Sequence, residues 1–418
     1  MQIVKNHKYW LCLEPYVFVF GGKDNYMLYN GFAHKYIIIN NIKENKDIIS
    51  VLDKMMDMGN MYCVCLSSQK LATEKFSTFI NDIRNGFYGD IYDEKIFETR
   101  PAIFPPIVNV KNSYVNINKE EELPRKSNLE RFLHELTIYI NGQCKNNCKN
   151  CSDYCKQLLF CTKGNDEMSE EIVKDIVNAI KTTKIAKVNI VGGDIFSYKP
   201  SDYLLCKLEE IGSKIEFYTH LQNLDLEKAK KILKLGFALC ICVTGNANKN
   251  EIKHIQHSLA EYKDLVKWKF IVTSEEELDN FNRLSGDDET NCLVYPYYNG
   301  NNVDFFKKYV FNKKSDFKGI DLSCEDVFKR QLYNLYDYGK LVITPNKQVY
   351  ANLNFPSIGI FEDDFMKFTK LLLTDDSPWF RTRKKIKPCN DCAFRYLCAS
   401  PSNYEIALNR NNLCTIIK

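Results

Sequence analysis

The chain has 418 residues, 45% hydrophobic and 26% charged, a balance typical of a globular protein that buries ordinary cores and not of a disordered or small disulfide-stapled one. Its net charge is only +4, from 57 basic and 53 acidic residues, so we expect no general attraction for polyanions and no nucleic-acid partner. No apolar run reaches the roughly 18 residues of a membrane span, and no secretory signal is visible. We therefore expect a cytoplasmic protein with no membrane partner.

The chain contains 17 cysteines. In a reducing cytoplasm, metal or iron–sulfur ligation explains clustered cysteines better than disulfides do. Two clusters occur, Cys144 to Cys161 and Cys389 to Cys414. Other cysteines lie in or beside apolar stretches, where we expect them to act as small buried hydrophobic residues. These are Cys12, Cys63, Cys65, Cys206, Cys240, Cys242 and Cys292.

The first segment predicts a three-stranded meander. Its aromatic and β-branched runs, Tyr9–Phe20, Tyr26–Tyr29 and Lys35–Ile39, are separated by turns rich in Gly, Asn and Asp. Helical periodicity follows over 47–58 and 73–84, and a short strand is predicted between them at 61–66. We predict a self-contained α+β module over residues 1–95. Connecting segments over 96–131 come next, including the charged run Lys119–Lys126.

Strands alternate with helices from Phe132 onward. The predicted strands are 136–140, 188–191, 215–218, 239–243, 267–272 and 292–295, and the predicted helices are 169–182, 201–211, 226–235 and 250–262. Repeated βα units with right-handed crossovers imply a parallel sheet, here an open or incomplete barrel over residues 132–322. Residues 323–418 combine a hairpin at 340–353, a helix at 363–373 and a cysteine-rich end.

Three cysteines, Cys144, Cys148 and Cys151, follow the first strand of the series with the spacing CxxxCxxC. Ligands of α/β sheets gather at the carboxyl ends of strands, so a reactive centre is expected there. Three thiolates can hold three irons of a 4Fe-4S cluster and leave the fourth iron open to a substrate. A zinc knuckle completed by Cys155 or Cys161 is the alternative.

The second strand runs directly into Gly192, Gly193 and Asp194. Glycines let the backbone approach a ligand closely, and a carboxylate can hold an ammonium group. The alternative is a turn whose Asp caps the helix that follows.

Residues 132–309 resemble the core of radical S-adenosylmethionine (SAM) enzymes. The resemblance implies a partial (β/α)6 barrel in which Cys144, Cys148 and Cys151 ligate a SAM-binding 4Fe-4S cluster. It also implies that Gly192, Gly193 and Asp194 line the methionyl end of SAM. Electron transfer from the cluster then cleaves SAM to methionine and a 5′-deoxyadenosyl radical, which abstracts hydrogen from a substrate.

Three departures from the family pattern are present. Asn150 replaces an aromatic residue, Asp194 is one methylene shorter than the usual Glu, and the sequence YTHL at 218–221 lacks the usual Thr-Asn-Gly. Degenerate relatives without a catalytic cluster exist, so an inactive protein that binds a peptide as an accessory partner is the alternative function.

Four cysteines near the C-terminus, Cys389, Cys392, Cys398 and Cys414, can close a site around Zn²⁺ or a 4Fe-4S cluster. The segment is similar to the SPASM domain of peptide-modifying radical SAM enzymes, in which these positions ligate an auxiliary cluster. A second auxiliary site is eroded. Cys324 fits as a first ligand, but Asn352 and Ser402 stand where the family has cysteines, so we expect one auxiliary 4Fe-4S cluster.

The N-terminal module resembles the winged-helix peptide clamps called RiPP recognition elements, which serve ribosomally synthesised and post-translationally modified peptides. By that resemblance, a leader peptide pairs with the exposed edge of the meander. An ordinary α+β interaction domain is the alternative.

Together these resemblances imply a radical SAM/SPASM oxidoreductase that modifies a ribosomally made precursor peptide, with an intrapeptide crosslink as the expected product. SAM, the SAM-binding cluster and one auxiliary cluster are the expected cofactors. An external electron donor such as flavodoxin or ferredoxin is an expected partner, and a paralogous maturase is a further candidate. A zinc-stapled interaction protein is a third interpretation.

Overall fold

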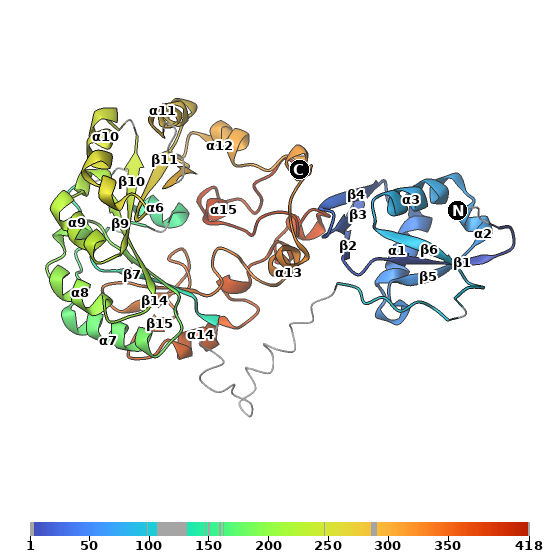
Figure 1. The fold of residues 1–418 in the computed structure, drawn as a ribbon, viewed down its shortest axis with the longest axis horizontal. Coiled ribbons are helices and arrows are strands. Elements are labelled where there is room, and N and C mark those ends of the chain that lie inside the picture. The colour runs from blue at the N-terminus through green and yellow to red at the C-terminus, as the bar shows by residue number, and fades with distance from the viewer. Residues whose placement is uncertain are drawn as a thin grey trace.

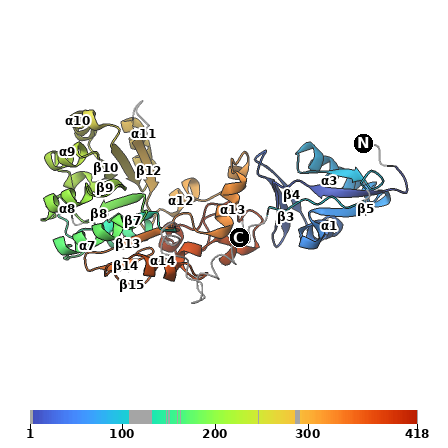
Figure 2. The ribbon, with the colours of Figure 1, turned by 60° about the horizontal axis from the view of Figure 1, so that its bottom comes forward.

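The computed structural model describes residues 4–97, 99–106, 132–146, 148, 151–158, 160–161, 163–245, 247–285 and 291–416. Asn150 and the charged run 119–126 lie outside the described residues. Figures 1 and 2 show an N-terminal module (blue) at one end and a sheet flanked by helices at the other, with part of the C-terminal tail (orange to red) between them. Among the described helices, none has both the length and the apolar character needed to cross a membrane.

The N-terminal module contains two antiparallel sheets of three strands, with the orders β5-β1-β6 and β2-β3-β4. Its strands are β1 (Lys8–Leu13), β2 (Val17–Gly21), β3 (Asn25–Asn30), β4 (Lys35–Asn40), β5 (Cys63–Ser67) and β6 (Gly89–Asp93), and its helices are α1 (Lys46–Met56), α2 (Ser68–Leu71) and α3 (Glu74–Asn85). Both sheets and the helices share one apolar core, to which Leu11 and Leu28 contribute.

The prediction of one continuous strand from Tyr9 to Phe20 is wrong. The chain turns at Pro15, with the Val17 amide donating to the Glu14 carbonyl at 3.0 Å, and β1 and β2 then enter different sheets. The physical reason is that proline has no N–H to donate to a strand ladder and fixes its own φ. The predicted meander therefore consists of β2, β3 and β4.

Cys12 and Cys63 are buried, as expected, but they are not free thiols, because they form a disulfide in the structure. Cys12 of β1 lies directly opposite Cys63 of β5 in the antiparallel register, with 4.3 Å between the Cα atoms, so their side chains meet. Cys206 likewise departs from the expectation because it is exposed, whereas Cys240 and Cys242 are buried.

The central region supplies six consecutive parallel strands in the order β12-β11-β10-β9-β8-β7. The strands are β7 (Glu135–Tyr139), β8 (Lys187–Val191), β9 (Lys214–His220), β10 (Ala238–Thr244), β11 (Val266–Val272) and β12 (Cys292–Pro296). The helices are α6 (Cys151–Gln157), α7 (Glu170–Lys181), α8 (Ser201–Leu208), α9 (Leu226–Lys234), α10 (Lys249–Ser258), α11 (Glu275–Ser285) and α12 (Val303–Tyr309). The predicted α/β alternation and parallel sheet are confirmed, while the closure of this sheet into a partial barrel stays a prediction.

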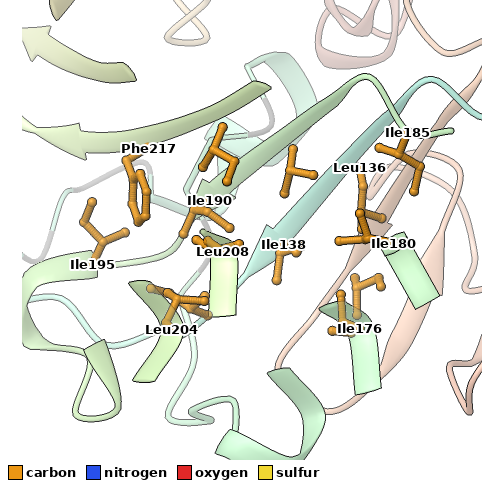
Figure 3. Packing of buried hydrophobic residues seen from close by; sticks show 14 of the residues in the cluster. Leu136, Ile138, Ile176, Ile180, Ile185, Ile190, Ile195, Leu204, Leu208 and Phe217 are labelled. Atoms are coloured by element: carbon orange, nitrogen blue, oxygen red, sulfur yellow. The ribbon is translucent and has the colours of Figure 1, made fainter. Parts of the chain in front are cut away.

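The two faces of this sheet differ in character because successive strand residues point to opposite sides. On β7, Leu136 and Ile138 are buried against the helices, and Figure 3 shows them beside Ile176 and Ile180 of α7. The Ser169 side chain caps α7 by accepting from the Ile172 amide, which fixes where the helix begins. The opposite face of the sheet carries polar residues and lines cavities.

The tail extends the same sheet. β13 (Lys340–Ile343) pairs in parallel with β7, and β14 (Gln348–Tyr350) and β15 (Gly359–Ile360) follow in antiparallel order. The tail helices are α13 (Cys324–Leu332), α14 (Met366–Leu372) and α15 (Asn403–Ala407). The sheet thus continues past residue 322, the predicted boundary between the central region and the tail.

The N-terminal module packs against the tail. An apolar cluster joins Phe18 and Phe20 of β2 to Phe394 and other residues of the tail. Arg395 Nη1 donates to the Gly21 carbonyl at 2.6 Å, and the Lys23 amide donates to the Asp391 carbonyl at 2.8 Å. The β2–β3 turn is therefore attached to the segment between Cys389 and Cys398.

Candidate functional site

The loops that follow β7 and β8 lie against each other. The side chain of Asn141, 1% exposed, donates from Nδ2 to the Asp194 carbonyl at 2.8 Å and accepts from the Gly193 amide at 3.2 Å. A Cβ added at Gly193 would lie 2.2 Å from the Gln143 carbonyl oxygen, and one at Gly192 would lie 2.4 Å from Asn141 Oδ1. Only glycine allows this approach, which holds the cysteine loop beside the glycine loop.

The three cysteines of the first motif line one cavity that opens to solvent. Gly192 and Gly193 contribute to its wall, as the sequence predicts for a ligand site at these strand ends. The remaining lining residues come from the cysteine loop, from α6 and the segment after it, and from the end of β9. They are Asn146, Tyr154, Phe160, Cys161, Lys163, Tyr218, Thr219, His220 and Asn223.

Asn223 connects the cysteine loop to the glycine loop. Its Nδ2 lies 3.3 Å from Cys144 Sγ and 3.3 Å from the Gly193 carbonyl oxygen, and its Oδ1 accepts from Asn146 Nδ2 at 2.8 Å. The Asn146 amide also donates to Cys144 Sγ at 3.5 Å. These contacts fix the position of the Cys144 sulfur at the wall of the cavity.

A further thiol, Cys161, lies beside the motif. Its Sγ is 3.6 Å from Cys151 Sγ, and its carbonyl oxygen accepts from Cys155 Sγ at 3.0 Å. Burial, followed by the nearby Cys151, raises the pKa of Cys161, and burial likewise raises the pKa of Cys148. These buried thiols stay protonated at neutral pH unless a cation lowers the pKa, as a bound metal does.

The sulfur donors bear on two kinds of metal site, a single ion and an iron–sulfur cluster. Within the described residues, no three His, Cys, Asp or Glu side chains come together closely enough to hold a single metal ion. A 4Fe-4S cluster is a larger body whose thiolates each bind a different iron, so its ligands stand around a cavity. Three sulfur ligands around one cavity are compatible with an iron–sulfur cluster, whose ligands need not converge on one point.

Asp194 has a structural contact. Its Oδ1 accepts from the Phe196 amide at 3.0 Å and caps a short 3-10 turn at Ile195–Ser197. Burial raises the pKa of this carboxyl group, with hydrogen bonds from Phe196 and Ser197 opposing the shift. Asp194 does not line the cavity formed by the described residues, although Gly192 and Gly193 do. The capping role weighed in the sequence is therefore present, on the 3-10 turn instead of the later helix.

His220 lies at the end of β9, which extends two residues further than the predicted strand. Its Nε2 is 2.8 Å from Thr244 Oγ1, and its Nδ1 accepts from the Gln222 amide at 3.2 Å. Burial lowers the pKa of this imidazole, so the ring is neutral at pH 7. The residues at the expected Thr-Asn-Gly positions thus supply a neutral ring and a hydroxyl to the cavity.

A second, larger cavity of about 420 Å³ lies on the polar face of the same sheet. Phe160 and Tyr218 line both cavities, so the two adjoin. The larger one reaches across β7, β8, β11 and β12 to tail residues that include Tyr336 and Tyr404. A molecule bound there would contact the sheet on one side and the tail on the other.

The C-terminal cysteines occupy one neighbourhood. Burial raises the pKa of Cys398 to about 12, an effect that Arg383 opposes and that Cys392, Cys414 and Cys389 reinforce. Burial likewise raises the pKa of Cys392 to about 11. Arg383 Nη1 lies 3.8 Å from Cys389 Sγ, and Asn412 Nδ2 lies 3.4 Å from Cys414 Sγ. Donors and a buried cation therefore surround a set of sulfurs that a metal centre would hold as thiolates.

The positions of the eroded auxiliary site have other partners. Asn352 Nδ2 donates to Asp337 Oδ1 and to Asn403 Oδ1, both at 2.8 Å. Ser402 caps α15. Cys324 packs at the interface with the N-terminal module, 3.9 Å from the Tyr16 carbonyl oxygen. A buried hydrogen-bond network thus occupies the place where the resemblance puts further ligands.

Sequence reasoning missed Asn141 and Asn223. Each follows a strand of the βα series, where polar residues gather at the carboxyl edge of a parallel sheet. A search for amide side chains just after each strand would have found both. Lys269 of β11, which lines the larger cavity, was missed because a lysine within a strand gives no such positional signal.

The fold and site define a mixed α/β protein with a large, mainly parallel sheet and a cysteine-lined cavity at its carboxyl edge. No protein-family model and no curated protein matches the chain. Among solved structures, SuiB from Streptococcus suis is 15% identical, with 97% of this chain and 100% of that chain covered and a TM-score of 0.43.

SuiB bound to the precursor peptide SuiA is 16% identical, with 97% of this chain and 98% of that chain covered and a TM-score of 0.44. A structure of anSMEcpe with bound AdoMet is 12% identical, with 63% of this chain and 88% of that chain covered and a TM-score of 0.45. Similarity at this level does not place the chain in a family. The function proposed below therefore depends on the residues of this chain.

Proposed function

We propose that the protein is a radical SAM enzyme that modifies a ribosomally synthesised precursor peptide. The observation that carries the proposal is the single cavity that joins Cys144, Cys148 and Cys151 to the backbone of Gly192 and Gly193. Three thiols leave one iron of a 4Fe-4S cluster without a protein ligand, and the glycine backbone beside them can approach a second ligand closely. The adjoining larger cavity offers room for a peptide.

The residues of the chain have distinct roles in this proposal. Cys144, Cys148 and Cys151 hold the cluster, and Gly192 and Gly193 bind the methionyl part of SAM through their backbone. When bound and reduced, the cluster supplies the electron that cleaves SAM to methionine and a 5′-deoxyadenosyl radical. Asn223 orients the cysteine loop through its contacts with Cys144 Sγ and the Gly193 carbonyl. Phe160 and Tyr218 border both cavities and restrict water at their junction.

The tail and the N-terminal module complete the proposal. Cys389, Cys392, Cys398 and Cys414 would hold one auxiliary 4Fe-4S cluster, which can accept the second electron that crosslink formation requires. A leader peptide would add a strand to an outer edge of the β2-β3-β4 sheet. The enzyme would work in the cytoplasm with a reducing donor such as flavodoxin or ferredoxin.

The first experiment measures metal and SAM cleavage together. The protein is purified anaerobically and reconstituted, its iron and sulfide are counted, and 5′-deoxyadenosine is quantified after reduction with SAM. We expect the triple variant Cys144→Ala, Cys148→Ala, Cys151→Ala to lose 5′-deoxyadenosine formation, and the exposed Cys206→Ala to keep it. Continued formation by the triple variant contradicts the proposed cluster ligands.

A second candidate function is an inactive protein that binds a precursor peptide as an accessory partner. One observation favours it: the Asp194 carboxylate caps the turn at Ile195–Ser197 and does not line the cysteine-containing cavity that the described residues form. SAM cleavage separates the two functions. The radical enzyme forms 5′-deoxyadenosine after reduction with SAM, whereas the accessory partner binds the precursor peptide and forms none.

A further inference from the structure

The polar face of the large sheet carries a row of paired charges. The Glu135 carboxylate on β7 lies 3.9 Å from Lys187 Nζ on β8 and 3.5 Å from Lys340 Nζ on β13. The Glu216 carboxylate on β9 lies 2.9 Å from Lys187 Nζ and 2.9 Å from Lys267 Nζ. Each of these lysines therefore has a carboxylate neighbour, and the row needs no external ion.

Lys269, two residues after Lys267 on β11, is different. In the described part of the chain, no carboxylate lies within ion-pair distance of its Nζ. Aromatic rings surround it instead: Nζ is 4.2 Å from the ring centre of Tyr295 and 5.6 Å from those of Phe160 and Tyr218. Ring faces attract an ammonium group and restrict its position, but they do not cancel its charge. The N–H donors of Lys269 stay available to a ligand.

Lys269 lines the larger cavity. Asn189 also lines it, with its Nδ2 donating to Glu135 Oε1 at 2.5 Å, but its Oδ1 is fully buried and so is closed to an occupant. The cavity thus presents the cation of Lys269 to an occupant.

Neither of the two acids in the cavity wall neutralises Lys269. Asp337 accepts from Asn352 Nδ2 at 2.8 Å and lies 3.9 Å from Arg381 Nη2. With Glu135 paired to Lys340, the side chains that line the cavity leave a positive charge at Lys269. An occupant that carries a carboxylate complements this charge.

We propose that the larger cavity binds an acidic residue of the peptide substrate, with Lys269 receiving its side-chain carboxylate. This inference rests on the proposed function and names the substrate class of the same site. SAM also carries a carboxylate, but neither Lys269 nor Asn189 lines the cysteine-containing cavity. Phe160 and Tyr218, which border both cavities, keep the bound residue next to the cysteine-containing cavity.

The test uses three capped tripeptides, N-acetyl-Ala-Glu-Ala-amide and its Gln and Lys counterparts, and needs no turnover. Their dissociation constants are measured on the full-length reconstituted protein by saturation-transfer NMR, with SAM present. We expect the Glu peptide to bind roughly tenfold more tightly than the Gln peptide, because a charge-assisted hydrogen bond replaces a neutral one. The Lys peptide should bind most weakly.

Variants assign the effect to Lys269. Lys269→Met should abolish the preference for Glu over Gln, and Lys269→Arg should retain it. Lys267→Met is the matched control because this lysine lies on the same strand and face but is paired with Glu216. The control should keep the preference, and the dissociation constant of SAM should be the same for the wild type and Lys269→Met.

Several results overturn the inference. For the wild type, they are equal binding of the Glu and Gln peptides, or no measurable binding of the Glu peptide at its solubility limit. For the variants, they are a Glu preference that survives Lys269→Met, a Glu preference that disappears with Lys267→Met, or a Lys269→Met protein that binds SAM more weakly but the peptide equally well. The proposed function fails separately, through the absence of 5′-deoxyadenosine. A Glu preference without SAM cleavage therefore supports the acidic-residue site and contradicts the radical SAM function. SAM cleavage without a Glu preference supports the radical SAM function and contradicts the acidic-residue site.

Discussion

Gly193 shows how a single residue can hold two loops together. The sequence suggests a glycine that lets a ligand approach, and the structure adds that the backbone of the cysteine loop also needs this space. The Gly193 amide donates to the Asn141 carbonyl at 3.1 Å, and the next amide, of Asp194, donates to the Gln143 carbonyl at 2.7 Å. The cysteine loop cannot keep its place if the glycine loop moves.

The substitution Gly193→Ala tests this coupling. Its Cβ would meet the backbone oxygen of Gln143 at 2.2 Å, a contact that no side-chain rotation can relieve. We expect a loss of roughly 1–3 kcal/mol in the free energy of unfolding, typical of overpacking, measured by chemical denaturation. The affinity for SAM should fall as well. Gly212→Ala, where a Cβ meets nothing within 4 Å, is the control and should change neither quantity.

The sequence could predict only those site residues that are marked by motif spacing or by their position at the end of a strand. The motif cysteines and glycines were found because spacing and strand ends mark them. Lys269 and Asn189 sit inside strands, where only the alternation of faces shows that they point away from the helices. That Asn189 Oδ1 lacks a donor depends on side-chain positions that residue order does not specify.

At the level of secondary structure, the ion-pair row explains how a parallel sheet tolerates charges on one face. Glu216 is 2% exposed. Burial alone would raise its pKa, but hydrogen bonds from Lys187 and Lys267 outweigh that effect and hold the pKa below the usual value. The carboxylate thus ties β8, β9 and β11 together across Cys240 of β10.

We expect Glu216→Gln to lower the free energy of unfolding by about 2–3 kcal/mol at pH 7, less than for a fully buried pair because both lysines are 31% exposed. The pKa of Glu216 is lower in the folded state than in the unfolded state. The stabilisation it contributes is therefore fully present above the unfolded-state pKa and is lost as pH falls through the folded-state pKa. The difference from wild type should therefore shrink below about pH 4. Urea denaturation across pH measures it, with Glu227→Gln, whose side chain is 87% exposed, as control. A difference that grows on acidification contradicts the assignment.

Strand prediction succeeded where pairing is local and failed where it is not. The six strands from β7 to β12 follow each other in space as they do in sequence, so apolar runs between helices predicted them. The pairing of β13 with β7, which matches Lys340 to Glu135, joins distant segments and has no local signal. The separation of β1 from β2 depended on Pro15, a residue that aromatic periodicity on both sides concealed.

For the whole molecule, the main relationship is the contact between the N-terminal module and the tail. Arg395 is central to it, since its Nη1 donates both to the Gly21 carbonyl at 2.6 Å and to the Cys392 carbonyl at 2.8 Å. One guanidinium therefore connects the β2–β3 turn to the loop that carries a proposed cluster ligand.

Replacing Arg395 with Ala should loosen this contact. Hydrogen bonds to charged groups typically contribute about 1.5–3 kcal/mol, so we expect the module to detach more often from the tail. The Lys23 amide, which donates to the Asp391 carbonyl across the contact, should then exchange with deuterium more rapidly, while core amides such as that of Leu11 should not change. Arg410→Ala, an exposed arginine of the same tail, is the control. Unchanged exchange at Lys23 would refute a role for Arg395 in docking.

The same contact has a consequence for biosynthesis. Arg395 is separated from Gly21 by 374 positions, so the β2–β3 hairpin emerges from the ribosome long before its docking surface is translated. During that interval, Phe18 and Phe20 lack the tail residues that cover them in the finished protein. A nascent chain with uncovered aromatic side chains is a substrate for chaperones, and yield should depend on them until translation ends.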